Sequence, residues 1–220
     1  MQDYETEEQQ LEALKKWWHE NGTSLIVGLG LGVAILFGGR YYINMQSEHR
    51  ASAGDLYFMV ADQVNKNNEQ GALETTARLT SEYQDTPYAA LAALIMARFE
   101  FEQSNPAEAM SQLEWVINNA DQIELQNIAR LRLARIHLGN AEYDMAEALL
   151  DTDHPTAFNA AYEELKGDVY VMRGRLAEAR IAYDKAIEAM GNNTSAWLRL
   201  KRQDLGNIQP EAADPVAPPA

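Results

Sequence analysis

The sequence predicts an all-α protein in which a single amino-terminal transmembrane helix precedes a helical solenoid. An uncharged, apolar segment occupies residues 23–39, and the chain after it is rich in Ala, Leu, Glu and Gln, with one small-residue spacing occurring three times. No window alternates with the period of two that a half-buried strand requires. We therefore divide the chain into an acidic head (1–22), a transmembrane helix (23–43), a repeat domain (44–205) and a tail (206–220).

The uncharged segment has the length and the flanks of a membrane-spanning helix. A span ending at Ile43 matches the roughly 30 Å of a bilayer core, because Arg40 near the helix end can extend to the headgroups. Two tryptophans precede the segment and two tyrosines follow it, as in interfacial aromatic belts. Its glycines disfavour a buried core helix in water. The small-x-small pattern Ala51-Ser-Ala53 lies too far beyond the segment for a cleaved signal peptide, so we expect an uncleaved anchor.

Gly28 and Gly32 are four residues apart within the predicted transmembrane helix. Small residues at this spacing allow another membrane helix to pack closely, although glycine is also common in such helices without that role. The positive charges leave the orientation of the helix open, because two lysines precede it and two arginines follow it. Packing at the two glycines is therefore a prediction, and the topology is undecided by the residues themselves.

The repeat domain carries the spacing of tetratricopeptide repeats. A small residue on one helix is followed twelve residues later by an alanine on the next helix, and a large residue comes four after that alanine. Antiparallel helices approach closely only where a small side chain faces a large one. The residues predicted to pack the repeats are Ala97, Ala109, Leu113, Ala134, Ala146, Leu150, Gly167, Tyr170, Ala179, Tyr183 and Ala186.

The copies of the repeat are uneven. Glu100 stands where the third copy has its tyrosine, and the run from Asp151 to Pro155 is expected to shorten the second helix of the second copy. A degenerate helix pair is expected at 51–65 and 69–83. A final helix near 194–204 is expected to cover the open end of the stack, since a terminal repeat otherwise exposes its apolar face.

Composition excludes several function classes. The formal net charge of −15 argues against a nucleic-acid binder, and the absence of cysteine excludes disulfides and metal–thiolate sites. No phosphate loop, nucleophile elbow or zinc motif occurs, so we expect no catalytic residue, cofactor, metal or small-molecule substrate. The cluster of Asp151, Asp153 and His154 is interpreted as a polar turn, and the proline-rich tail is expected to be disordered.

A solenoid of this kind binds its partners along an extended concave surface. From the phase of the predicted helices we place Arg98, Arg135 and Tyr170 on the inner helices, as candidates for a partner groove.

Three features occur in a characteristic order. An acidic head ends in Lys15-Lys-Trp-Trp-x-x-Asn-Gly22, one glycine-rich membrane helix closes in Gly39-Arg-Tyr-Tyr42, and a degenerate tetratricopeptide body follows. In this order the chain resembles the YfgM family of ancillary SecYEG translocon subunits over residues 1–205. The segments Thr86–Ala97 and Leu131–Arg135 are also similar to a signature of that family.

The resemblance implies a bacterial inner-membrane protein with a cytoplasmic amino terminus and periplasmic repeats. It implies two partners, the SecYEG translocon and a membrane-anchored periplasmic chaperone of the prolyl-isomerase type, and a non-enzymatic role in passing exported proteins to periplasmic chaperones. The residues alone leave an alternative open. In that alternative, a membrane-anchored tetratricopeptide scaffold recruits regulatory or envelope-assembly proteins.

Overall fold

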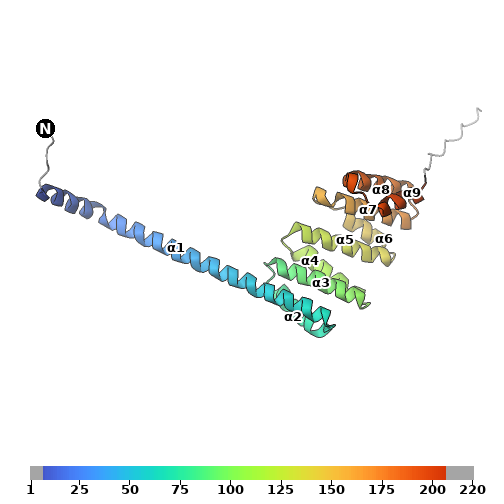
Figure 1. Cartoon of the computed structure of the whole chain (residues 1–220), viewed down its shortest axis with the longest axis horizontal. Helices are drawn as coiled ribbons and strands as arrows, with labels where there is room; N and C mark the ends of the chain where they lie inside the picture. The colour runs from blue at the N-terminus through green and yellow to red at the C-terminus, as the bar shows by residue number, and fades with distance from the viewer. Residues whose placement is uncertain (1–6, 207–220) are drawn as a thin grey trace, which may run out of the picture. The chain divides into compact units, whose positions relative to one another are not determined.

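The computed structural model of the chain describes residues 7–206, and within that range it contains helices and short connections but no strand (Figure 1). This confirms the predicted all-α class. The tail predicted at 206–220 lies outside the described residues except for Gly206, as do the first six residues of the acidic head. The helices are α1 (Glu7–Asn65), α2 (Glu69–Glu82), α3 (Pro87–Glu102), α4 (Pro106–Asn119), α5 (Ile123–Gly139), α6 (Tyr143–Leu150), α7 (Asn159–Met172), α8 (Leu176–Met190) and α9 (Ala196–Asp204), with 3₁₀ turns η1 (Thr156–Phe158) and η2 (Gly191–Asn193).

The chain forms two compact units, and the boundary between them falls after Ser52, inside α1. The first unit is a stretch of helix whose apolar side chains face outward. Ile35, Leu36 and Phe37 are each more than 70% exposed. In the described residues, α1 is the one helix long and apolar enough to cross a membrane. A core helix would bury these apolar side chains, whereas a helix surrounded by lipid exposes them.

The second unit, from Ala53 onward, is a stack of antiparallel helix hairpins. The last part of α1 shares a buried cluster with α2, and α3 pairs with α4, α5 with α6 and α7 with α8, after which α9 follows (Figure 1). The fourth residue of each second helix is a fully buried alanine. These alanines are Ala72, Ala109, Ala146 and Ala179.

The first hairpin is in phase with the other three, although the sequence predicts it only as a degenerate pair. Val60 precedes Ala72 by the same twelve residues, and both side chains are fully buried. Thr76 occupies the position of the large residue four after the alanine and is 2% exposed. A valine in place of the small residue, and a threonine in place of the large one, conceal the repeat in the sequence.

All four hairpins close with the same turn. The residues Asn67, Ser104, Ala141 and Gly174 each adopt a positive φ between 54° and 74°. In each turn the following residue donates its backbone N–H to the carbonyl oxygen five residues earlier, as in Asn105 to Glu100 at 2.8 Å and Glu142 to His137 at 2.9 Å. This is the Schellman ending of a helix, which satisfies carbonyls left open at the last turn.

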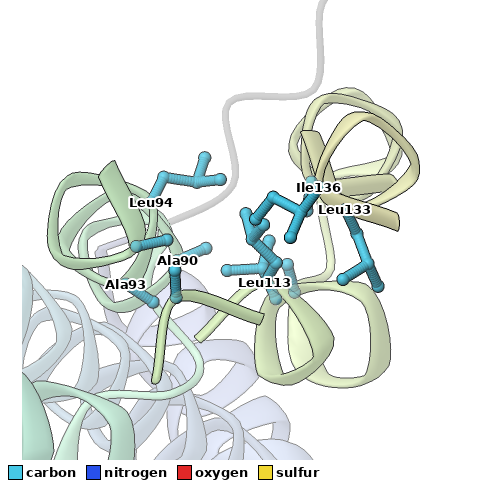
Figure 2. Close-up of a cluster of buried hydrophobic side chains, with 11 residues drawn as sticks. Ala90, Ala93, Leu94, Leu113, Leu133 and Ile136 are labelled. Carbon is cyan, nitrogen blue, oxygen red and sulfur yellow. The ribbon is translucent and has the colours of Figure 1, made fainter. Parts of the chain in front are cut away.

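The core is distributed along the stack. Figure 2 shows the largest cluster, in which Leu113 of α4 lies between Ala90 and Leu94 of α3 and Leu133 and Ile136 of α5. At the far end, Leu198 of α9 is fully buried against Tyr183 and Ala186 of α8, so α9 covers the last hairpin. The second helix of the third hairpin, α6, stops at Leu150 before the Asp151–Pro155 run, as expected.

Candidate partner-binding groove

Two of the three predicted groove residues line one cavity. Arg98 of α3 and Arg135 of α5 border a space of about 290 Å³ between these two first helices of successive hairpins. Leu113 of α4, labelled in Figure 2 among the buried cluster, also lines this cavity. The lining is completed by Ala97, Phe101, Arg132 and Ile136.

The cavity combines an apolar floor with a cationic rim. Ala97, Leu113 and Ile136 are buried beneath it, whereas the side chain of Phe101 is 55% exposed at its edge. Exposed aromatic side chains next to arginine are the residue types enriched at protein interfaces. The cavity therefore offers apolar area and charge to the same ligand.

Arg132 connects the two helices that form the cavity. Its Nη1 donates to the carbonyl oxygen of Leu94, at 3.2 Å. Burial lowers the pKa of Arg132, and the positive charges of Arg135 and Arg98 lower it further. The guanidinium group of Arg132 is thus close enough to those of Arg135 and Arg98 to be repelled by both.

The chain supplies little negative charge to this cluster. Arg98 pairs with Glu102 at 2.7 Å, but both side chains are more than half exposed, and such pairs contribute little. Within residues 7–206, neither Arg132 nor Arg135 forms an ion pair. Cations nearer the carboxyl end differ, because Arg202 pairs with Asp184 and Lys201 with Asp168.

A second cavity lies nearer the amino end of the stack and shares one lining residue with the first. It has a volume of about 420 Å³, and Arg98 borders both cavities. The end of α1, the turn after it and the last turns of α3 with the following residue contribute its other lining residues, which are Ala61, Val64, Asn65, Asn67, Ile95, Phe99, Glu102 and Gln103. We call the two cavities together the arginine groove.

Tyr170 lies on α7, outside the two cavities of the arginine groove, and its part in partner binding stays a prediction. It lies near the end of α7, beside the turn that Gly174 makes, and the guanidinium carbon of Arg175 is 4.4 Å from the centre of its ring. Burial raises the pKa of Tyr170, and the charge of Glu147 raises it further. Its ring therefore contacts a charged residue of its own hairpin.

The remaining repeat residues named in the sequence analysis lie in the interior of the stack. Gly167 meets the ring of Tyr183 so closely that a Cβ at this position would be 2.3 Å from the Cε1 atom. The buried members are Ala97, Ala109, Leu113, Ala134, Ala146, Leu150, Gly167, Ala179, Tyr183 and Ala186.

Gly28 and Gly32 lie in the first unit with open space around them. A Cβ added at either position would meet nothing within 4 Å. The surface there is free for another helix, and packing against one stays a prediction.

The polar turn between α6 and α7 shows no arrangement suited to a metal. His154 stacks on the ring of Tyr162 at 3.9 Å, and its Nδ1 lies 2.8 Å from the carbonyl oxygen of Thr152. Asp151 pairs with Lys166 at 2.7 Å. No group of three or more potential metal-binding side chains occurs in the described part of the chain.

The sequence itself is similar to known proteins over nearly its full length. A family model described as a tetratricopeptide repeat-like domain matches residues 15–207. An ancillary SecYEG translocon subunit of Neisseria gonorrhoeae is 31% identical over 84% of this chain and 88% of its own length. The chain belongs to this family.

Two further ancillary SecYEG translocon subunits support the assignment to the family. The one from Escherichia coli is 29% identical and covers 94% of this chain and 99% of its own length. The one from Haemophilus influenzae is 28% identical over 90% of this chain and 97% of its own length. No solved structure matches the chain. The family resemblance predicted from the order of its segments is confirmed.

Sequence reasoning missed Arg132 and Phe101, which line the groove beside the predicted arginines. The signal was present for Arg132, because residues three apart share one face of a helix and Arg132 precedes Arg135 by three. Phe101 gives no such signal, since the exposure of an apolar residue depends on which neighbouring helices pack against it.

Proposed function

We propose that this family member is a single-pass membrane subunit of the SecYEG translocon, and that its repeat domain binds protein partners through the arginine groove. The observation that carries the proposal is the groove itself. It provides an apolar floor and a cationic rim on a helical stack whose nearly full-length relatives bear the name of that complex. Binding rather than catalysis suits a surface of this composition.

The proposal includes an orientation. The amino terminus lies in the cytoplasm and the repeats lie in the periplasm, so that the exposed apolar part of α1 spans the inner membrane. The anchor then holds the groove near the translocon exit and raises its effective concentration there. A membrane-anchored periplasmic chaperone of the prolyl-isomerase type is the second proposed partner, to which exported chains would pass.

In this proposal the two partners bind two different surfaces of the chain. The open face around Gly28 and Gly32 packs against a membrane helix of the translocon, since small residues allow close approach in lipid. The arginine groove binds the chaperone. Each contact can therefore be removed without the other.

The test is copurification with the tagged full-length chain from detergent-solubilised membranes. The unaltered chain is expected to recover both SecYEG and the chaperone. Gly28→Leu with Gly32→Leu is expected to lower recovery of SecYEG, whereas Arg132→Gln with Arg135→Gln is expected to lower recovery of the chaperone alone. Recovery of SecYEG no greater than that with an unrelated single-pass protein would contradict the translocon assignment.

A further inference from the structure

We infer that the arginine groove takes an acidic and apolar segment of a partner protein. A large apolar side chain of that segment fills the cavity between α3 and α5, and its carboxylates bind Arg132 and Arg135. The inference rests on the proposed function only in that the ligand is a protein, and it adds the chemistry by which that ligand is recognised.

The cavity between α3 and α5 is large enough for an apolar side chain. Its volume of about 290 Å³ exceeds the roughly 150 Å³ in which an apolar protein cavity can hold benzene. Ala97, Leu113 and Ile136 form a floor without a polar atom to satisfy. A leucine- or phenylalanine-sized side chain fits such a space and would cover the exposed ring of Phe101.

Three guanidinium groups at the rim of the cavity would bind the carboxylates of the segment. They lie together in a chain that holds 33 acidic and 18 basic residues, yet no carboxylate of residues 7–206 pairs with Arg132 or Arg135. Mutual repulsion in the empty groove is relieved when an anion binds. Guanidinium groups bind carboxylates through two parallel hydrogen bonds. A carboxylate in the groove would therefore be held both by charge attraction and by hydrogen bonds of matching geometry.

A protein segment fits these observations better than a polyanion does. Nucleic acid would be repelled by the net charge of −15 and would leave the apolar floor uncovered. Charge complementarity therefore selects a segment in which Asp or Glu adjoins a large apolar residue.

The experiment places a photocrosslinker in the groove. The full-length chain with Phe101→p-benzoylphenylalanine is expressed in cells and irradiated in intact membranes, and mass spectrometry identifies the crosslinked segment. We expect a segment of another protein with acidic residues beside an apolar one. We also expect Arg132→Gln with Arg135→Gln, or Arg135→Gln alone, to lower the yield, by about tenfold for the pair, because a lost charge-assisted hydrogen bond has that effect.

Arg78→Gln is the matched control. Arg78 lies on α2, pairs with Glu82 and lines neither cavity of the groove, so its loss removes one positive charge elsewhere. The crosslink yield with this variant is expected to equal that of the photocrosslinker chain in which every arginine is retained. Circular dichroism of each variant verifies that the helical stack is retained.

Several results would overturn the inference. They are a crosslinked segment without acidic residues, a yield unchanged by the glutamine substitutions, a crosslink to residues 207–220 or to a second copy of this chain, or no crosslink at all. Recovery of SecYEG is measured on the same membranes. If SecYEG still copurifies, only the inference fails, and if it does not copurify with the unaltered chain, the proposed function fails.

Discussion

Gly167 shows how strongly a single small residue constrains the stack. It lies on α7 directly against the ring of Tyr183 on α8, and a Cβ there would be 2.3 Å from the ring. Neither helix backbone nor a buried tyrosine moves freely in a close-packed interior. The small residue of the repeat is therefore a condition for the approach of α7 and α8.

Gly167→Ala is expected to lower the free energy of unfolding by about 1–3 kcal/mol, the usual cost of overpacking a core. Urea titration of the full-length chain in detergent, followed by circular dichroism, measures the change. Gly139→Ala is the control, because a Cβ at that helical position meets nothing within 4 Å. Equal effects of the two substitutions would contradict the packing role of Gly167.

A buried hydrogen bond joins α5 to α7. The hydroxyl of Tyr162 donates to Oδ1 of Asn127 at 2.6 Å, and both side chains are fully buried. Tyr162→Phe leaves that amide oxygen without its partner, so it is expected to lower the free energy of unfolding by about 1–3 kcal/mol. The same urea titration measures it, and an unchanged midpoint would show that the bond contributes nothing net.

At the scale of the helices, the hairpin turns explain why the copies look so different in sequence. The positive-φ position is filled by Asn67, Ser104, Ala141 and Gly174, and only the last lacks a side-chain penalty there. The turn geometry is thus set by the backbone hydrogen bonds and by the packed helices on either side. The residue type at the positive-φ position changes only the conformational free energy that the turn costs.

Opposite effects are expected from exchanging residues at two of these turns. Ala141→Gly is expected to raise, and Gly174→Ala to lower, the free energy of unfolding by about 1 kcal/mol, because a left-handed conformation is costly for residues with a Cβ. Both positions are exposed, so packing changes little. Thermal denaturation compares the pair, and a shift in the same direction for both would contradict this account.

A polar network ties α7, α8 and α9 together. Asp168 accepts from the Tyr183 hydroxyl at 2.7 Å and from Nζ of Lys201 at 2.8 Å, and Glu164 also accepts from Lys201. Burial raises the pKa of Tyr183, as do its hydrogen bond to Asp168 and the charge of that group. Burial lowers the pKa of Lys201, but its hydrogen bonds to Asp168 and Glu164 outweigh this and raise it overall.

The network predicts alkaline destabilisation. Both folded-state pKa values lie above those of the unfolded chain, so the stabilisation is complete below about pH 10 and is lost as pH rises beyond it. Melting midpoints measured from about pH 8 to about pH 11 should fall more steeply for the unaltered chain than for Tyr183→Phe. Parallel curves would contradict the role assigned to the tyrosine hydroxyl.

Periodicity in the sequence predicts the helices and their order because it reports which side chains must be buried. It predicts the short α6 through the Asp151–Pro155 run and the covering helix α9 through the need to close the stack. It cannot show that Arg175 lies over the ring of Tyr170, because that contact depends on the turn between α7 and α8. It selects Arg98 and Arg135 but misses Arg132 and Phe101 beside them, because a cavity shared by neighbouring hairpins depends on their packing.

At the scale of the whole molecule, the two units place their apolar side chains in different environments. The first unit exposes large apolar side chains that suit lipid, and the second buries its alanines and leucines between helices. In a solenoid each hairpin contacts mainly its neighbours, so the stack gains stability locally and leaves a continuous inner surface for ligands. The arginine groove is part of that surface. The partners that can reach it depend on which side of the membrane the repeat domain lies.

Protease accessibility of the repeat domain decides that point. Intact cells, spheroplasts and inverted membrane vesicles are treated with protease, and the fragments are detected with an antibody against the repeat domain. We expect cleavage in spheroplasts and protection in intact cells and inverted vesicles, which places the groove in the periplasm. Cleavage in inverted vesicles with protection in spheroplasts would contradict this account and support a cytoplasmic scaffold.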